Sequence, residues 1–244
     1  MGMAISKNEI YLGDCRDLID SVPDLDKAIL VTDPPFNIGY HYEGYEDKMG
    51  EDEYYSMLVG LINKCGGRAV IIHYPEALHE LSIRLGKRPT RVCSWVYNSN
   101  TPRQHRDIAY YGITPVMKQM TQPFKNPTDR RIAERIERGI EGGALYDWFE
   151  ANQIKNVSDE KYDHPCQMPI KVMLNAIGVL PKGECSLIVE PFCGTGTTCL
   201  AARELGWDYI GFDINEKYVG IAKERLMGTT PKEIKTGVRQ LKLF

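Results

Sequence analysis

Two acidic residues flank a glycine turn with the spacing of a nucleoside-binding site. Glu190 ends an apolar run, and the turn Gly194-Thr195-Gly196 follows it directly. Glycines let the backbone approach a ligand closely, and a helix beginning near Thr197 would point free N–H groups at that ligand. Asp213 ends a second apolar run seventeen residues after Gly196. A carboxylate at that point can bind both hydroxyls of a ribose.

The charges near this turn favour S-adenosylmethionine over a dinucleotide. A dinucleotide site normally carries a third small residue under the pyrophosphate, and here that position is Cys199. Glu190 would repel a pyrophosphate but attract an ammonium group. S-adenosylmethionine carries an ammonium, a sulfonium and a ribose, so it is the predicted cofactor. The alternative is that Glu190 and Asp213 are strand-end acids that face solvent.

Another apolar run, residues 28–32, leads into the second motif, Asp33-Pro34-Pro35-Phe36. Each proline fixes its own φ and restricts the residue before it, so the turn is stiff. It would hold a carboxylate, a free backbone carbonyl and a flat ring in one place. These groups suit an aromatic amine on a planar heterocycle. The alternative is a structural turn that only caps a strand.

Alternating strands and helices would position both motifs. Apolar runs predict strands at 9–12, 28–32, 68–73, 92–97, 186–192 and 209–214, and helical patterns cover 52–64, 76–85, 169–177, 197–205 and 216–227. This alternation predicts a parallel sheet covered on both faces, with ligands at the carboxyl ends of the strands. Residues 115–163 interrupt it without a convincing buried strand, and they include an arginine-rich helix. They predict an insertion on the sheet.

The composition excludes a collagen, a coiled coil and a wholly disordered chain. The chain has 244 residues, of which 43% are hydrophobic and 26% charged, and it lacks an apolar run of membrane-spanning length. No export signal is recognisable, so the seven cysteines are interpreted as reduced thiols in a cytoplasmic protein. Their spacing to the histidines predicts no metal site.

The net charge of −3 argues only mildly against a nucleic-acid partner, because the charge is segregated. Residues 81–106 hold six basic residues and no acid, whereas residues 43–53 hold six acids and one lysine.

Together the motifs resemble those of the S-adenosylmethionine-dependent amino-methyltransferases of DNA, which methylate N6 of adenine or N4 of cytosine. Asp33-Pro34-Pro35-Phe36 resembles their catalytic motif, and residues 190–198 resemble their cofactor motif. The order, catalytic motif first, is similar to the beta class. The resemblance implies an α/β fold: a Rossmann-like, doubly wound, seven-stranded sheet with circularly permuted motif order and a small, mostly helical insertion. It divides the chain into a catalytic half (1–114), a target-recognition insertion (115–163), a cofactor-binding half (164–227) and a tail (228–244).

The resemblance also implies roles for individual residues. The catalytic positions are Asp33, Pro34, Pro35 and Phe36. The cofactor-binding positions are Asp14, Cys15, His164, Gln167, Glu190, Phe192, Cys193, Gly194, Thr195, Gly196, Thr197, Thr198 and Asp213. Met168 stands where the family usually has a lysine.

The implied reaction is direct methyl transfer to the amine of a base flipped out of double-stranded DNA. Hydrogen bonds from the amine to the Asp33 carboxylate and the Pro34 carbonyl would free the nitrogen lone pair, and Phe36 would stack on the base. DNA contacts are predicted for Arg103, Arg106, Arg131 and Arg135. For the helix at 128–138, the alternative is a solvated helix with internal ion pairs.

Adenine is favoured over cytosine because family members acting on cytosine more often have serine in place of Asp33. Alternatives are N4-cytosine methylation, an RNA substrate and a catalytically silent binding subunit; the intact Asp33 motif argues against the last. An insertion of this size favours a homodimer or a helper subunit for target recognition. The resemblance implies a restriction-modification role, the residues identify no partner nuclease, and no membrane partner is expected.

Overall fold

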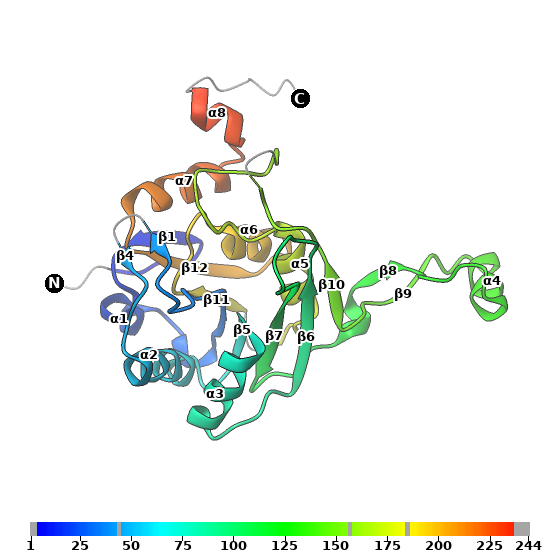
Figure 1. Ribbon diagram of the computed structural model, residues 1–244, viewed down its shortest axis with the longest axis horizontal. Helices are drawn as coiled ribbons and strands as arrows, with labels where there is room; N and C mark the ends of the chain where they lie inside the picture. Colours follow the sequence, from blue (N-terminus) through cyan, green and yellow to red (C-terminus); the bar gives the residue numbers. More distant parts are fainter. Residues whose placement is uncertain (1–3, 43–44, 156–157, 184–185, 237–244) are drawn as a thin grey trace.

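An eight-stranded sheet forms the centre of the described chain, residues 4–42, 45–155, 158–183 and 186–236 of this computed structural model (Figure 1). In order across the sheet, the strands are β1 (Glu9–Leu12), β12 (Asp208–Asp213), β11 (Leu187–Glu190), β2 (Ile29–Thr32), β5 (Ala69–His73), β7 (His105–Tyr111), β6 (Arg91–Val96) and β10 (Trp148–Glu150). β7 runs antiparallel to both of its neighbours, and the other pairs are parallel.

The two late strands, β11 and β12, lie between the two early strands, β1 and β2. Glu9 pairs with Ile210, and Ile188 pairs with Ile29. Because β2 and β11 are parallel neighbours, their carboxyl ends meet at one edge of the sheet. The Asp33 turn and the Glu190 turn follow those two ends, so the two motifs lie side by side.

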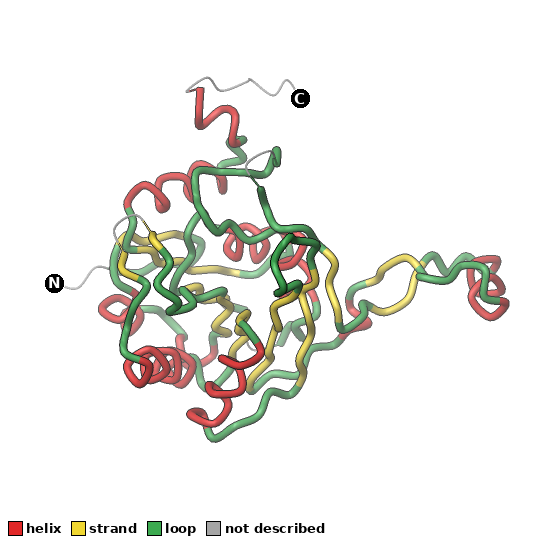
Figure 2. Tube along the Cα trace, viewed as in Figure 1, coloured by secondary structure: helices red, strands yellow, loops and turns green. Residues whose placement is uncertain are grey.

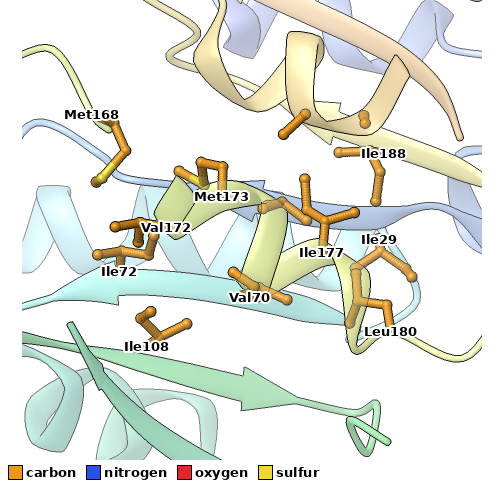
Figure 3. Close-up of a cluster of buried hydrophobic side chains, with 14 of the residues drawn as sticks. Ile29, Val70, Ile72, Ile108, Met168, Val172, Met173, Ile177, Leu180 and Ile188 are labelled. Atoms are coloured by element: carbon orange, nitrogen blue, oxygen red, sulfur yellow. The ribbon is translucent and has the colours of Figure 1, made fainter. Parts of the chain in front are cut away.

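Helices cover both faces of the sheet (Figure 2). Buried side chains of α1 (Cys15–Leu18), α2 (Glu51–Lys64) and α3 (Pro75–Leu85) pack on one face; those of α5 (Ile170–Gly178), α6 (Thr197–Glu204) and α7 (Glu216–Leu226) pack on the other. Figure 3 shows Val172, Met173 and Ile177 of α5 over Ile29 and Val70 of the sheet. Alternate strand residues enter opposite cores, so the strands are apolar throughout, as parallel sheets require.

The remaining elements are short. Three 3-10 turns, η1 (Ile19–Ser21), η2 (Leu25–Lys27) and η3 (Met117–Gln119), join larger elements, and β3 (His41–Tyr42) pairs with β4 (Tyr45–Glu46). α8 (Pro231–Thr236) ends the described chain. The rest of the predicted tail, residues 237–244, and Cys185 lie outside the described residues. No described helix is both long and apolar enough to cross a bilayer.

Residues 115–163 differ from the prediction. β8 (Thr121–Pro123) and β9 (Gly142–Ala144) form a hairpin that carries α4 (Arg130–Glu137), and Figure 1 shows this arm projecting from the body. β10 then returns to the sheet and pairs with β6, and its Phe149 is 2% exposed. The predicted seven strands are therefore one too few, and "mostly helical" is wrong for this segment. A three-residue strand is too short to show a sequence period.

Candidate active site

The two motifs line one cavity of about 410 Å³ at the carboxyl edge of the sheet. Asp33 and Phe36 enter it from the turn after β2, Glu190 and Gly194 from the turn after β11, and Asp213 from the end of β12. The strand order explains this meeting, because β2, β11 and β12 are consecutive and parallel.

Glu190 is a buried carboxyl group held by three donors. Its Oε1 accepts hydrogen bonds from Thr32 Oγ1 at 2.5 Å and from the Phe192 backbone N–H at 3.1 Å, and its Oε2 accepts from Thr198 Oγ1 at 2.7 Å. Burial raises the pKa of Glu190 to about 8, although these hydrogen bonds oppose the rise. The acid is therefore not a solvent-facing strand end; it ties β2, β11 and α6 together.

Asp213 closes the glycine turn from the neighbouring strand. Its Oδ2 accepts from the Gly194 N–H at 2.8 Å, and its Oδ1 accepts from the Asn215 N–H at 2.9 Å. Burial raises the pKa of Asp213. Gly194 and Gly196 have φ of +50° and +75°, values that favour glycine, and α6 begins directly after them.

Cys199 lies where α6 packs closely on β12. A Cβ on Gly211 of β12 would stand 2.8 Å from the Cys199 sulfur. The small residue that permits close packing is therefore on the strand rather than on the helix. This arrangement explains why Cys199 is tolerated at a position where a dinucleotide fold usually has glycine or alanine.

Arg225 supports the same turn from α7, and the sequence reasoning missed it. Its Nη1 donates to Thr195 O at 3.2 Å and to Thr197 Oγ1 at 2.7 Å, and its guanidinium lies 5.0 Å from the Tyr162 ring centre. The residue is 5% exposed. An arginine in the last turn of a helix is common in sequences, so nothing marked this one as buried.

The Asp33 carboxylate is buried with one oxygen unpaired. Within the described chain, Oδ1 has no hydrogen-bond partner, and Oδ2 lies 3.4 Å from Arg106 Nη1. Burial raises the pKa of Asp33 to about 6, and the charge of Arg106 opposes the rise. A buried acceptor without a donor is costly unless a ligand supplies the donor.

A hydrogen-bonded chain that sequence reasoning did not identify holds the proline turn. The Tyr74 N–H donates to His73 Nδ1 at 2.7 Å, His73 Nε2 lies 3.0 Å from the Tyr54 hydroxyl, and that hydroxyl donates to Pro35 O at 2.8 Å. These bonds assign the ring proton to Nε2. Burial lowers the pKa of His73 to about 3, so the ring stays neutral. In contrast to Pro35, the Pro34 carbonyl accepts no hydrogen bond within the described chain.

Aromatic rings and one guanidinium surround Phe36. Its ring centre lies 4.5 Å from that of His73 and 4.9 Å from that of Tyr74, and the Arg106 guanidinium lies 4.5 Å away. The flat slot beside Asp33 is thus lined by π surfaces.

With the exception of Gly196, the other predicted cofactor residues also line the cavity. Asp14 caps α1 and bonds Arg16, and burial raises the pKa of the Cys15 thiol to about 12. His164 packs 4.5 Å from the Tyr218 ring centre. The Gln167 amide bonds backbone atoms of its own loop, accepting from Tyr162 N and donating to Glu160 O, so it shapes the loop.

The four arginines predicted to bind DNA lie in three different places in the structure. Arg103 is exposed, stacks 4.3 Å from the Tyr74 ring centre and pairs with Glu76. Arg131, with a side chain 89% exposed, and Arg135 lie on α4 at the end of the arm, away from the cavity (Figure 1). Arg106 is different: its side chain is 12% exposed and lies in the cavity. Because β7 runs antiparallel to its neighbours, its first residues lie at the site. In this conformation Arg106 is therefore not placed for a surface contact with a phosphate.

A sequence model of the adenine-N6/cytosine-N4 family, described as DNA methylase, matches residues 74–224. The chain belongs to this family. Its members use S-adenosylmethionine as methyl donor, which agrees with the cofactor predicted from the charges. Among the described residues, no group of three or more His, Cys, Asp or Glu side chains is placed to hold a metal ion.

Individual relatives in this family span most of the chain. The type II methyltransferase M.BglII of Bacillus subtilis is 25% identical over 91% of this chain and 69% of its own, and the DNA adenine methyltransferase YhdJ of Escherichia coli K12 is 24% identical over 89% and 82%. Among solved structures, the PvuII DNA methyltransferase (cytosine-N4-specific) has a TM-score of 0.62 at 17% identity, covering 96% of this chain and 94% of that one. The M1.HpyAVI–SAM complex has a TM-score of 0.58 at 16% identity, covering 89% and 98%. Both confirm the predicted α/β methyltransferase fold.

Proposed function

We propose that this DNA methyltransferase methylates N6 of an adenine that has been flipped out of duplex DNA. The observation that carries the proposal is the unpaired Asp33 Oδ1, buried beside the Phe36 ring in the same cavity as the Glu190 and Asp213 turns. A carboxylate acceptor and a flat ring fit an exocyclic amine on a base. The base must leave the helix because the site lies inside a cavity.

The turn after β11 fits S-adenosylmethionine. Two carboxyl groups line the cavity here, Glu190 at the end of β11 and Asp213 at the end of β12, and they suit an ammonium and a ribose. In the proposal, Asp213 binds the ribose, Glu190 faces the ammonium, and the backbone at Gly194 lets the ligand approach closely. Gly196 lies outside the cavity lining, and a Cβ there would stand 3.0 Å from the Ala222 side chain, so this glycine permits close packing of α7 instead. Asp14, Cys15, His164 and Gln167 line the same cavity. When bound, S-adenosylmethionine supplies an electrophilic methyl group.

The residues of the catalytic turn bind and orient the amine. Asp33 Oδ1 and the Pro34 carbonyl accept its two N–H groups, which directs the nitrogen lone pair away from the ring. Phe36 stacks on the base, and the chain through His73 and Tyr54 fixes the Pro35 carbonyl and hence the turn. Catalysis of this kind depends on positioning and electrostatics rather than on a strong base.

Asp33 favours adenine over cytosine, since family members acting on cytosine more often carry serine there. The comparisons include both kinds of enzyme: YhdJ is named an adenine methyltransferase, and the PvuII enzyme is named cytosine-N4-specific. N4-cytosine methylation is therefore the second candidate. Relatives named type II methyltransferases support a place in restriction-modification.

Target recognition is assigned to the insertion. In the proposed division, residues 1–114 and 164–227 build the core, with β10 added at the edge of its sheet, and the rest of residues 115–163 reads DNA. The exposed arginines of α4 suit phosphate contacts, and a homodimer would add a second arm to the duplex.

One experiment tests the proposal. Purified protein is incubated with S-adenosylmethionine and genomic DNA, and the product is analysed by nucleoside mass spectrometry and single-molecule sequencing. We expect N6-methyladenine at one short sequence. N4-methylcytosine would overturn the adenine assignment. Unmodified DNA with intact cofactor binding would overturn the enzymatic one and favour the silent subunit. The Asp33→Ala variant is the control: it should bind cofactor as the wild type does and transfer no methyl group.

A further inference from the structure

Arg106 occupies the space beside the catalytic turn. Its Nη1 faces Asp33 Oδ2 at 3.4 Å, and its guanidinium lies 4.5 Å from the centre of the Phe36 ring. The same group lies 5.2 Å from the Trp95 ring and 5.9 Å from the Tyr74 ring. Its Nε is buried without a hydrogen-bond partner in the described chain.

These contacts are the ones that the target base needs. A guanidinium is planar, presents N–H donors at its edge and stacks on aromatic faces. The amino edge of adenine has the same features: a planar ring with an exocyclic N–H pair. A base that stacks on Phe36 and donates to Asp33 therefore competes with Arg106 for one ring and one carboxylate.

The fit of Arg106 is loose. The distance of 3.4 Å is long for a charge-assisted hydrogen bond, which is usually 2.7–2.9 Å. Asp33 Oδ1 and Arg106 Nε both lack partners. A buried ion pair with unsatisfied atoms contributes little net stability, because desolvation offsets the attraction. The ion pair with Asp33 therefore does not by itself hold Arg106 in place.

The Arg106 side chain can be displaced toward Arg103. Arg103 precedes Arg106 by three residues, its guanidinium lies 4.3 Å from the centre of the Tyr74 ring, and its side chain is 53% exposed. A guanidinium that leaves Phe36 toward Arg103 would join a second positive charge on the surface, where the DNA backbone would stabilise it.

We propose that Arg106 is an internal substitute for the target base: it fills the Asp33–Phe36 slot in the DNA-free protein and leaves when the flipped base enters. This inference rests on the proposed function, since it requires that the slot receives the base. On entering the slot, the base replaces the Arg106 guanidinium, and both groups are planar hydrogen-bond donors. The guanidinium also shields the catalytic carboxylate from other amines.

The test uses the duplex whose modified site the mapping experiment identifies, with 2-aminopurine in place of the base next to the target adenine, so that the target keeps its N6 amino group. The fluorescence of this neighbour rises when the target base leaves the stack. Binding is measured at pH 8.5, well above the pKa of about 6 for Asp33 in the wild type, because removal of the Arg106 charge raises this pKa further. Arg106→Met removes the guanidinium but keeps an extended side chain. Arg103→Met is the matched control, because it removes one positive charge from the surface without opening the slot.

We expect Arg106→Met to bind this duplex about three to ten times more tightly than Arg103→Met does, with a larger fluorescence rise at saturation. That factor corresponds to a slot that Arg106 fills about 70–90% of the time, because the apparent affinity scales with the open fraction. Equal or weaker binding by Arg106→Met would overturn the proposal and make Arg106 a partner of the bound base.

A third variant separates this failure from failure of the proposed function. Phe36→Ala should lose the fluorescence rise if the slot receives the base. If Phe36→Ala also matches the wild type, the base does not enter this slot, and the proposed function fails together with the inference. If only the Arg106 result fails, the proposed function stands.

Discussion

Glu190→Gln should abolish a proton release that accompanies cofactor binding. Burial raises the pKa of Glu190 to about 8 in the ligand-free protein, so at pH 7 about nine-tenths of the molecules carry the proton. An ammonium group placed beside the carboxyl group favours its ionised form. Binding at pH 7 should therefore release up to about 0.9 proton, and affinity should rise as the pH increases from 6 to 8.

The assay is isothermal titration calorimetry with S-adenosylhomocysteine in buffers of different ionisation enthalpy, which counts the protons without turnover. 5′-Methylthioadenosine lacks the ammonium group and is the ligand control: it should release none of these protons from the wild-type protein. Glu190→Gln should bind S-adenosylhomocysteine more weakly and without proton release. Equal release by the wild type and by the glutamine variant would refute the assignment of Glu190 to the ammonium.

Stability provides a check that the variant is folded. The pKa of Glu190 in the folded protein lies above its ordinary value of 4.5, so unfolding releases a proton between pH 4.5 and pH 8. The contribution of this group to the free energy of unfolding therefore falls as the pH rises through that window. Glu190→Gln removes the decline, and at pH 8 the gain in unfolding free energy is at most about 4 kcal/mol. Denaturant titrations at pH 5 and pH 8 measure it.

The remaining predictions concern the catalytic turn, the core and the arm. Because the pKa of Asp33 is raised to about 6, protonation removes the acceptor below that pH, and kcat/KM should fall about tenfold per pH unit there; a flat profile from pH 5 to 7 would contradict its role. Tyr54→Phe should lower kcat about tenfold without changing cofactor affinity, at a stability cost of about 1 kcal/mol, and unchanged kcat would show that the turn needs no such support. Gly211→Ala should lower the unfolding free energy by about 1–3 kcal/mol in denaturant titrations, since its Cβ meets a buried sulfur. Arg131→Ala and Arg135→Ala should each reduce the salt slope of DNA binding by about one, whereas unchanged slopes would remove α4 from the interface.

Most of the sheet could be predicted from the sequence because its strands are continuous apolar runs. The predicted range 28–32 differs from β2 by one residue at its start, and the range 209–214 differs from β12 by one residue at each end. β10 could not be predicted, because its three residues become a strand only through pairing with β6. Phe149 is buried by that pairing and not by any local pattern.

The motif residues of the site could likewise be predicted from the sequence, since prolines, glycines and strand-end acids act through local geometry. The residues that hold these motifs in place could not be predicted. His73, Tyr54 and Arg225 are ordinary in sequence, and their burial follows from strand order and helix docking. Arg106 was assigned to DNA on charge alone, and only the antiparallel direction of β7 places it beside Asp33.

The order of the strands has a consequence for synthesis and folding. β2, which carries the catalytic turn, is made early, but one of its two neighbours in the sheet, β11, is made more than 150 residues later. β1 must wait longer still, because its partner is β12. Contacts so distant along the chain slow folding. A growing chain therefore exposes an unpaired edge of β2 until residues 187–213 emerge. Folding and methyl transfer would then depend on the same late segment of the chain, because the strands that complete the sheet are the ones that end at the cofactor turn.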